Sequence, residues 1–373
     1  MSYYDVVEVG SHPTLQTPGK GLGIKAIAGS PHHSTLFIAF GKKGETIDKQ
    51  KDKNDYSVVE IPFNHKPLRT NLGFFGKVYR VVLKLYVIAT FIFRMLRYLR
   101  RVDYQIINLH SLMLLPALVF ISSNKKKILT FRGSDFEPFM KSKSMRYMAS
   151  FCDEFHCVSL KHKFFLQEHY DKKIVIIDNF VDVEMFKSKM TTKRLNKKNI
   201  VVIAGLREVK GVDRSLKIFN ELLQLDSDWT LNICGSGPEM NALKRWCQVN
   251  SIVDHVIFHG SLGREQLKTV IQSSCICMID SRNEGFPKSM LEALAAGCFV
   301  AHSGQGECSR ILDGLGFEYS VFDPGAIAAH IAQVSRNSDL FLHESARANI
   351  LAEQYSKHEY CSRIENSYQI LIR

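Results

Sequence analysis

The stretch that most constrains the fold is a strand, a turn and a helix in succession near residue 285. The apolar run Ile276–Ile279 predicts a buried strand, which ends at the polar turn from Asp280 to Gly285. A helix is expected from about Pro287, because proline suits a first helical position, where the N–H it lacks has no partner. Gly297 is placed to end that helix. Free amides and the positive end of the helix dipole collect at such an N-terminus, so the stretch predicts an anion site.

Two acids accompany this turn with seven residues between them. Glu284 lies in the turn, and Glu292 lies about a turn and a half into the expected helix. Both are candidates for holding parts of one ligand. Two structural alternatives remain open: an acid before a helix is favourable to its dipole, and Glu292 stands four residues after Lys288, where an ion pair can form.

Apolar strands alternate with helical segments along the chain, which favours parallel, doubly wound sheets. The expected strands are residues 6–9, 34–40, 104–109, 125–131, 155–159, 173–177, 200–204, 229–234, 256–259, 276–279 and 299–302. Ligands of such sheets bind beyond the carboxyl ends of the strands. His110 and the segment from Arg132 to Asp135 follow two strands directly, so their position makes them candidates for binding. A lone histidine in a structural role is the alternative.

The length of 373 residues allows two domains, each with a full core. The formal net charge of +12 fits an anionic partner: a nucleotide, a phosphorylated lipid, an anionic membrane surface or nucleic acid. Nine scattered cysteines without a C-x2-C pair favour a reducing cytoplasm and no zinc site. We expect neither a signal peptide nor a transmembrane helix, because the start lacks a basic and apolar pattern and no 18-residue apolar window occurs.

The segment Leu72–Arg101 is a long basic helix without a single acid. Its apolar residues recur at helical spacing, and one interpretation is a stripe that packs on the sheet. Its cationic residues predict contact with an anionic membrane surface. We expect both: the stripe lies in the core and the basic rim touches lipid. The cations are Lys77, Arg80, Lys84, Arg94, Arg97, Arg100 and Arg101.

The pattern E-G-F-P-x-x-x-L-E-A-x-A-x-G from Glu284 to Gly297 resembles the signature of the family-4 retaining glycosyltransferases, which have the GT-B fold. Three further segments are similar to family motifs: Gly205 to Gly211, Gly235 to Glu239, and Asp178 to Asp182, where Phe180 replaces a glycine. The resemblance covers essentially the whole chain, strongly over residues 200–315 and loosely before residue 180.

The resemblance implies an α/β chain of two Rossmann-like, doubly wound parallel-sheet domains facing across a cleft. We expect an acceptor-binding domain over residues 1–185 and a nucleotide-sugar-binding domain over residues 200–355. Residues 186–199 are basic and polar, which predicts a linker. Residues 340–373 are expected to be helical, and residues 356–373 to return to the first domain.

The resemblance also assigns roles residue by residue. His110 would approach the donor sugar and phosphates, Glu284 would hold sugar hydroxyls, and Lys210 would meet the diphosphate. The family's arginine falls on Gly205, so Arg207, two residues later, is the candidate replacement. The remaining donor-binding candidates are Gly235, Gly237, Glu239, Gly285, Phe286, Pro287, Ser289 and Glu292. The acceptor or phosphate-loop candidates are Gly19, Gly21, Arg132 and Asp135.

The implied reaction moves a sugar from a nucleotide diphosphate sugar to a hydroxyl of a glycan or polyprenyl-diphosphate-linked acceptor, with retention and in cell-surface polysaccharide synthesis. We expect no metal, because a D-x-D motif is not seen, and neither a cofactor nor a nucleic-acid partner. The expected location is the cytoplasmic face of the membrane. Two alternatives are a non-catalytic sugar-nucleotide or glycan-binding protein of this fold, and a sugar-nucleotide epimerase or hydrolase.

Overall fold

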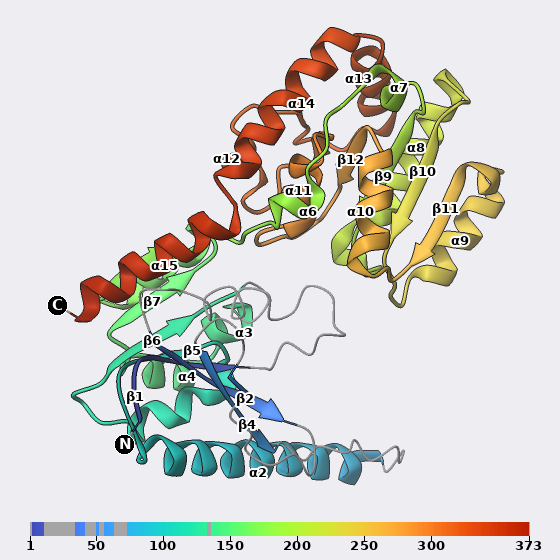
Figure 1. Ribbon diagram of the computed structural model, residues 1–373. Helices are drawn as coiled ribbons and strands as arrows, with labels where there is room; N and C mark the ends of the chain where they lie inside the picture. Colours follow the sequence, from blue (N-terminus) through green and yellow to red (C-terminus); the bar gives the residue numbers. More distant parts are fainter. Residues whose placement is uncertain are drawn as a thin grey trace. The chain divides into compact units, whose positions relative to one another are not determined.

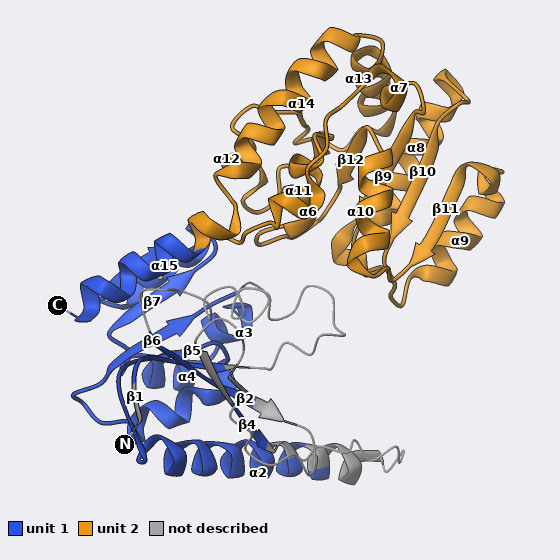
Figure 2. Ribbon diagram, viewed as in Figure 1, with its two compact units in different colours: residues 1–177, 361–373 blue, residues 178–360 orange. Residues whose placement is uncertain are grey.

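The chain forms two compact units, each built around a parallel sheet (Figures 1 and 2). The computed structural model describes residues 2–10, 34–41, 50–51, 56–62, 73–132 and 136–372. Unit 1 comprises residues 1–177 and 361–373, and unit 2 comprises residues 178–360. The chain therefore leaves unit 1, completes unit 2 and returns to unit 1.

The described part of unit 1 holds an eight-stranded sheet in the order β3-β4-β2-β1-β5-β6-β7-β8. Neighbouring strands are parallel, except that β3 runs antiparallel to β4. The strands are β1 Ser2–Gly10, β2 Thr35–Gly41, β3 Gln50–Lys51, β4 Tyr56–Pro62, β5 Val102–Leu109, β6 Lys126–Thr130, β7 Glu154–Cys157 and β8 Lys173–Ile176. The parallel order confirms the sequence prediction, to which it adds β3 and β4.

Helices connect these strands, as parallel strands require a crossover. They are α2 Gly73–Leu99, η1 Leu112–Phe120, α3 Phe136–Lys141, α4 Lys143–Ala149 and α5 Leu160–His169. A further helix, α15 Lys357–Ile372, follows the strands of unit 2 and connects no strands. The segment η1 is a 3-10 helix that contains Pro116. Proline disfavours a regular α-helix there, because its ring clashes with the carbonyl of the residue four positions earlier.

The long helix α2 packs on the sheet along one stripe only. Val87, Phe91, Met95 and Leu99 are buried in the core of unit 1. The sequence predicted that the apolar residues of this helix form a core stripe, yet several of them, such as Leu85, are exposed. Helical periodicity brings residues onto common faces, but it does not reveal which of two apolar faces meets the sheet.

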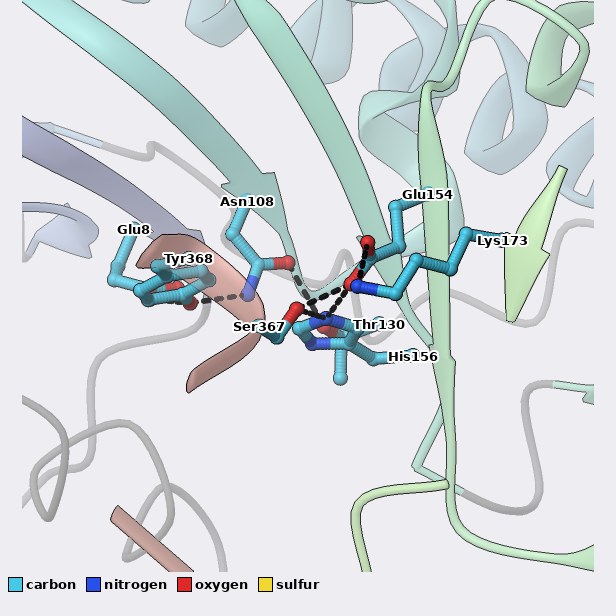
Figure 3. A network of polar contacts seen from close by, with 8 residues as sticks. All are labelled: Glu8, Asn108, Thr130, Glu154, His156, Lys173, Ser367 and Tyr368. Atoms are coloured by element: carbon cyan, nitrogen blue, oxygen red, sulfur yellow. Dashed lines mark hydrogen bonds and ion pairs between the residues drawn. The ribbon is translucent and has the colours of Figure 1, made fainter. Parts of the chain in front are cut away.

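The C-terminal helix α15 is held on the sheet of unit 1 by buried polar contacts (Figure 3). The Tyr368 hydroxyl donates a hydrogen bond to the carboxylate of Glu8 in β1. The same hydroxyl accepts a hydrogen bond of 2.9 Å from Nδ2 of Asn108 in β5. The other end of the Asn108 amide accepts a hydrogen bond of 2.8 Å from Thr130 in β6. One side chain of α15 is thereby connected to three neighbouring strands.

A second buried cluster continues this row of contacts along the sheet (Figure 3). Ser367 of α15 donates to the Glu154 carboxylate, and Nε2 of His156 lies 2.9 Å from both of them. Lys173 makes an ion pair of 3.0 Å with the other oxygen of Glu154. Burial raises the pKa of Glu154, but the hydrogen bonds from His156 and Ser367 outweigh it and hold the pKa below its usual value.

Unit 2 holds a six-stranded, wholly parallel sheet in the order β11-β10-β9-β12-β13-β14. Its strands are β9 Asn199–Ile203, β10 Thr230–Cys234, β11 Val256–Gly260, β12 Ile276–Ile279, β13 Phe299–His302 and β14 Phe317–Glu318. Its helices are α6 Val183–Phe186, α7 Thr192–Leu195, η2 Glu208–Lys210, α8 Val212–Leu225, α9 Met240–Val249, η3 Val253–His255, α10 Arg264–Ser273, α11 Lys288–Ala295, α12 Cys308–Leu312, α13 Pro324–Ser335 and α14 Ser338–Glu353.

The segment expected to link the domains, residues 186–199, belongs to unit 2 and contains α7. Its Arg194 is buried, and the guanidinium donates to the carbonyls of Ile271, Ser274 and Ala296. A buried cation needs such partners, and their carbonyls belong to segments that are distant in sequence. Contacts therefore divide the chain after Ile177, earlier than the expected end of the first domain at residue 185.

The last segment is divided into two helices, where the sequence indicated one helical region. Helix α14 ends at Glu353 within unit 2, and α15 starts at Lys357. Residues from Cys361 onward belong to unit 1, so the chain does return to it. Among the described residues, no helix is both long and apolar enough to cross a membrane.

We predict that Tyr368→Phe destabilises the protein by about 1–3 kcal/mol, because Glu8 and Asn108 each lose a buried hydrogen-bond partner. Chemical denaturation followed by circular dichroism measures this. Tyr147→Phe is the matched control, since Tyr147 is exposed on α4 of the same unit. Equal stability of the two variants would contradict the importance of this contact.

Candidate functional site

Four loops meet at the carboxyl edge of the sheet in unit 2. They follow β10, β9, β12 and β13, which are successive neighbours in the sheet. The backbone amide of Arg282 donates to Val209, and that of Glu307 donates to Gly285. Leu206 and Ser236 join the first two loops in the same way. The edge is therefore continuous, and side chains from loops up to about a hundred residues apart in sequence lie together.

Asp280 anchors the loop after β12. It is buried and accepts hydrogen bonds from the hydroxyls of Ser215 on α8 and Tyr319 after β14. Burial raises the pKa of Asp280 to about 6, against the effect of these two donors. Gly211 packs so closely here that a Cβ atom would lie 2.0 Å from the Asp280 carbonyl oxygen, and its φ of 63° also favours glycine.

Lys210 and Glu284 are brought together at the centre of this edge. The Lys210 ammonium makes an ion pair with the Glu284 carboxylate, which also accepts a hydrogen bond of 3.2 Å from Ser281. The other Glu284 oxygen accepts from the Gly285 amide at 3.2 Å. Both side chains are mostly buried, with 22% of Lys210 and 12% of Glu284 exposed. The pair thus holds side by side an acid that can accept from a hydroxyl and a cation that can bind an anionic group.

Arg207 lies beside the backbone of Gly205. Its Nε atom is 3.9 Å from the point where a Cβ atom on Gly205 would stand. The guanidinium of Arg207 therefore occupies space next to residue 205, where the resemblance implies an arginine. Arg207 itself is exposed, so its cation is available at the edge of the sheet.

The helix α11 starts at this edge. Pro287 is its N-cap, and the helix begins at Lys288, one residue later than the sequence predicted. The side chain of Pro287 makes no capping hydrogen bond, so it does not pair with the first backbone amides of α11, among them that of Ser289. Phe286 is buried, and its carbonyl accepts a weak hydrogen bond of 3.5 Å from Asn179. The left-handed Gly297, with a φ of 68°, follows the helix as predicted.

Glu292 lies on α11 in a strongly desolvated position. Burial raises its pKa to about 7, and the nearby cations Arg264 and Lys288 lower it without cancelling the effect. A surface ion pair would have lowered the pKa below its usual value. Glu292 is therefore a carboxyl group whose charge changes near neutral pH.

The loop after β10 carries the predicted Gly235, Gly237 and Glu239. Gly235 has a φ of 152°, and a Cβ atom there would lie 1.8 Å from the carbonyl oxygen of Ala204. This close approach holds the loop on the loop after β9. Within the described residues, Oε2 of Glu239 is buried without a hydrogen-bond partner. An unpaired buried carboxylate oxygen costs free energy and is available to a ligand donor.

A separate group lies at the carboxyl edge of the sheet in unit 1. His110 follows β5, and its Nε2 is 2.5 Å from Oε2 of Glu8. Its Nδ1 lies 3.2 Å from Nη2 of Arg132, which follows β6. Burial and Arg132 lower the pKa of His110, while Glu8 raises it. A neutral ring that donates from Nε2 to Glu8 and accepts at Nδ1 from Arg132 satisfies both contacts.

The predicted candidates thus fall into two groups, one in each unit. Asp135, Gly19 and Gly21 lie outside the described residues.

Sequence reasoning did not select Glu8, Ser281 or Glu307 for the sites. The turn from Gly304 to Glu307 after β13 was visible as a glycine-rich segment, and its strand-end position is the signal that could have selected it. Glu8 gave no such signal, because its partners His110 and Tyr368 are distant in the sequence. Ser281 gave none, because a serine three residues before Glu284 does not stand out in the sequence.

Two family models match the chain. Residues 184–351 match the model described as "Glycosyl transferases group 1", and residues 30–185 match the model described as "Glycosyltransferase Family 4".

Individual proteins agree with these models. An uncharacterized glycosyltransferase of Haemophilus influenzae is 25% identical over 253 residues, which are 66% of this chain and 70% of that protein. The lipopolysaccharide 1,6-galactosyltransferase of Salmonella typhimurium is 26% identical over 145 residues, or 38% of this chain and 40% of that protein. The crystal structure of Anabaena HepE in complex with UDP-glucose has a TM-score of 0.73 at 13% identity, covering 98% and 99% of the two chains. At that identity, the likeness shows the fold.

We predict that Glu292→Gln stabilises the protein more at pH 8 than at pH 5. The raised pKa means that ionising Glu292 costs more in the folded than in the unfolded state. That cost is absent below the ordinary carboxyl pKa near 4.5, grows as the pH rises, and is fully present above about 7. Thermal melts at both pH values measure the difference. Glu221→Gln on the exposed side of α8 is the control, and an equal response of both variants would contradict the desolvation of Glu292.

Proposed function

The chain belongs to the family-4 glycosyltransferases, and we propose from this premise that it transfers a sugar from a nucleotide diphosphate sugar to a hydroxyl with retention of anomeric configuration. The observation that carries this proposal is the Lys210–Glu284 pair at the carboxyl edge of unit 2. Its polarity suits a donor that has an anionic diphosphate next to a sugar rich in hydroxyl groups. The GT-B fold of the relatives agrees with it.

In this proposal the leaving diphosphate is stabilised by positive potential instead of a metal ion. Lys210 turns from Glu284 to the phosphates, and Arg207 supplies the cation that family members carry at position 205. The amides at the start of α11, near Ser289, add to this potential. Preorganised charges of this kind stabilise the transition state because they need no rearrangement as the negative charge develops.

Glu284, once released from Lys210, accepts hydrogen bonds from hydroxyls of the donor sugar. Glu292 holds the ribose, and its pKa of about 7 makes that contact sensitive to pH. The loop with Gly235, Gly237 and Glu239 lies beside the base. The departing phosphate oxygen takes the proton of the acceptor hydroxyl as the new glycosidic bond forms.

The proposed acceptor is a glycan or a polyprenyl-diphosphate-linked sugar, and the proposed pathway is the synthesis of a cell-surface polysaccharide such as capsule, lipopolysaccharide or exopolysaccharide. The similarity to the Salmonella lipopolysaccharide galactosyltransferase supports this pathway. A UDP-sugar carrying a hexosyl or N-acetylhexosaminyl group is the proposed donor, supported by HepE, which binds UDP-glucose. For His110 the proposed role is contact with the donor sugar and phosphates, and for Arg132 contact with the acceptor or a phosphate, as the resemblance implies. The protein would act in the cytoplasm on the inner membrane face.

Incubation with radiolabelled nucleotide sugars, with and without lipid-linked acceptors, tests the proposal. Transfer of label to the acceptor supports it. Binding without turnover would indicate a sugar-nucleotide-binding protein, and release or isomerisation of the free sugar nucleotide would indicate a hydrolase or an epimerase.

We predict that Glu284→Gln lowers turnover by about two orders of magnitude or more while the fold stays intact, a typical loss for a group that acts in the transition state. Initial rates of sugar transfer measure it. Glu208→Gln is the control, because Glu208 is an exposed acid in the adjoining loop. Turnover of Glu284→Gln close to wild type would remove Glu284 from the reaction.

We predict that Lys210→Ala and Arg207→Ala each weaken binding of the nucleoside diphosphate by about ten- to a hundredfold, since a charge-assisted hydrogen bond contributes roughly 1.5–3 kcal/mol. Calorimetry measures the affinity, with Lys217→Ala on the exposed side of α8 as the control.

The double variant Gly205→Arg/Arg207→Ala should recover much of the affinity that Arg207→Ala loses. A Cβ atom on Gly205 meets other atoms only at 3.9 Å or more, so the site accommodates the family's arginine. Unchanged affinity of Arg207→Ala would refute the replacement of the missing arginine by Arg207.

A further inference from the structure

Helix α2 has a second apolar face that no described part of unit 1 covers. The core stripe at Val87, Phe91, Met95 and Leu99 is buried. On the opposite side, Val82, Leu85, Tyr86 and Phe93 are 57%, 61%, 65% and 65% exposed. Spacings of three, four, seven and eleven residues place these four on one side of a helix. Exposed apolar side chains that cluster in this way mark a contact surface.

The same outward side becomes basic toward the end of the helix. Arg97 and Arg100 continue the line of Phe93 at helical spacing, and Arg94 and Arg101 lie beside them; all four are exposed. The segment Leu72–Arg101 contains no acidic residue. An apolar band that borders a purely cationic one suits a partner with an apolar interior and an anionic surface.

We propose that this outer face, formed by Val82, Leu85, Tyr86, Phe93, Arg97 and Arg100, inserts into the interface of an anionic lipid bilayer. The apolar side chains enter the boundary of the acyl chains, and the arginines bind phosphate headgroups. The helix then lies in the membrane plane and does not cross it, because it is not apolar enough to span a bilayer. Figure 1 shows α2 running along the outside of unit 1.

Charge favours lipid over a second copy of the chain. A symmetric dimer through this face would set the same patch against itself. In such a dimer the arginine cluster of each copy lies against either the other arginine cluster or the apolar side chains, and no acid of the segment Leu72–Arg101 neutralises it. A bilayer supplies the apolar and the anionic component together.

The inference rests on the proposed function in one respect: a lipid-linked acceptor is confined to the same surface, so attachment there raises its encounter rate with the site. An inserted apolar face also changes the expected dependence of membrane binding on salt. A basic rim alone would be released by salt, because screening weakens exposed charges. An inserted apolar face keeps part of the binding at high salt.

The test is cosedimentation of the full chain with phosphatidylglycerol-containing vesicles, without any sugar nucleotide. Leu85→Gln/Tyr86→Gln/Phe93→Gln should lower the partition coefficient by about tenfold or more, and should abolish the binding that survives high salt. The matched control, Val249→Gln/Val321→Gln/Ile350→Gln, removes three apolar side chains of unit 2 that are at least as exposed, and should bind like wild type. Replacing the four arginines near the end of α2 by Gln should remove the preference for anionic over neutral vesicles; they are Arg94, Arg97, Arg100 and Arg101.

A second readout reports insertion directly. Tryptophan at position 93, as Phe93→Trp, should be quenched by brominated lipid, whereas the wild-type tryptophans Trp229 and Trp246 of unit 2 should not be.

Vesicle binding of the outer-face variant equal to wild type, or no binding by wild type, would overturn the proposal. So would a dimer of wild type in ultracentrifugation that the outer-face variant loses, which would indicate an interface between copies. Sugar transfer to a soluble acceptor is measured separately. If the wild-type protein shows no transfer, the proposed reaction is refuted, and the vesicle result is not affected.

Discussion

Unit 1 depends on the buried carboxylate of Glu8. This acid lies in β1, at the middle of the sheet, and is fully buried. A carboxylate in such a place is tolerated only where donors compensate its lost hydration. The donors are Tyr368 from the end of the chain and His110 from the candidate site. One charge therefore links the packing of the C-terminal helix to the orientation of a site histidine, and Arg132 extends the link to the next strand.

Unit 2 also contains a buried acid at its sheet, but the donors to this acid all lie within residues 178–360. Asp280 is the buried acid at its strand end, and the hydroxyls of Ser215 and Tyr319 supply the donors. These contacts fix the loop that carries Glu284, opposite the loop that carries Lys210. Each unit thus positions its candidate site through one buried carboxylate at the sheet, although the two acids have different partners.

The sequence predicted the strand ends and hence much of the site. Glu284 and Lys210 were selected from different motifs, and the structure brings them into contact because β9 and β12 are neighbours in the sheet. Local patterns could not reveal the contacts of Glu8, whose partner Tyr368 is 360 residues away. They also could not reveal the division after Ile177, which depends on where side chains pack. In α2 the periodicity was clear, but two apolar faces share one helix, and only the sheet decides which is buried.

The discontinuity of unit 1 has a consequence for biosynthesis. Unit 2 is one uninterrupted stretch, residues 178–360, and all its strands are available once that stretch has left the ribosome. Unit 1 emerges first, but Glu8 and Glu154 remain without Tyr368 and Ser367 until residues after Cys361 follow. The contacts of these two acids with α15 are therefore absent throughout the synthesis of unit 2. Glu8 and Glu154 gain the hydroxyl donors Tyr368 and Ser367 only from α15, so a segment translated after unit 2 completes the sheet that was translated before it.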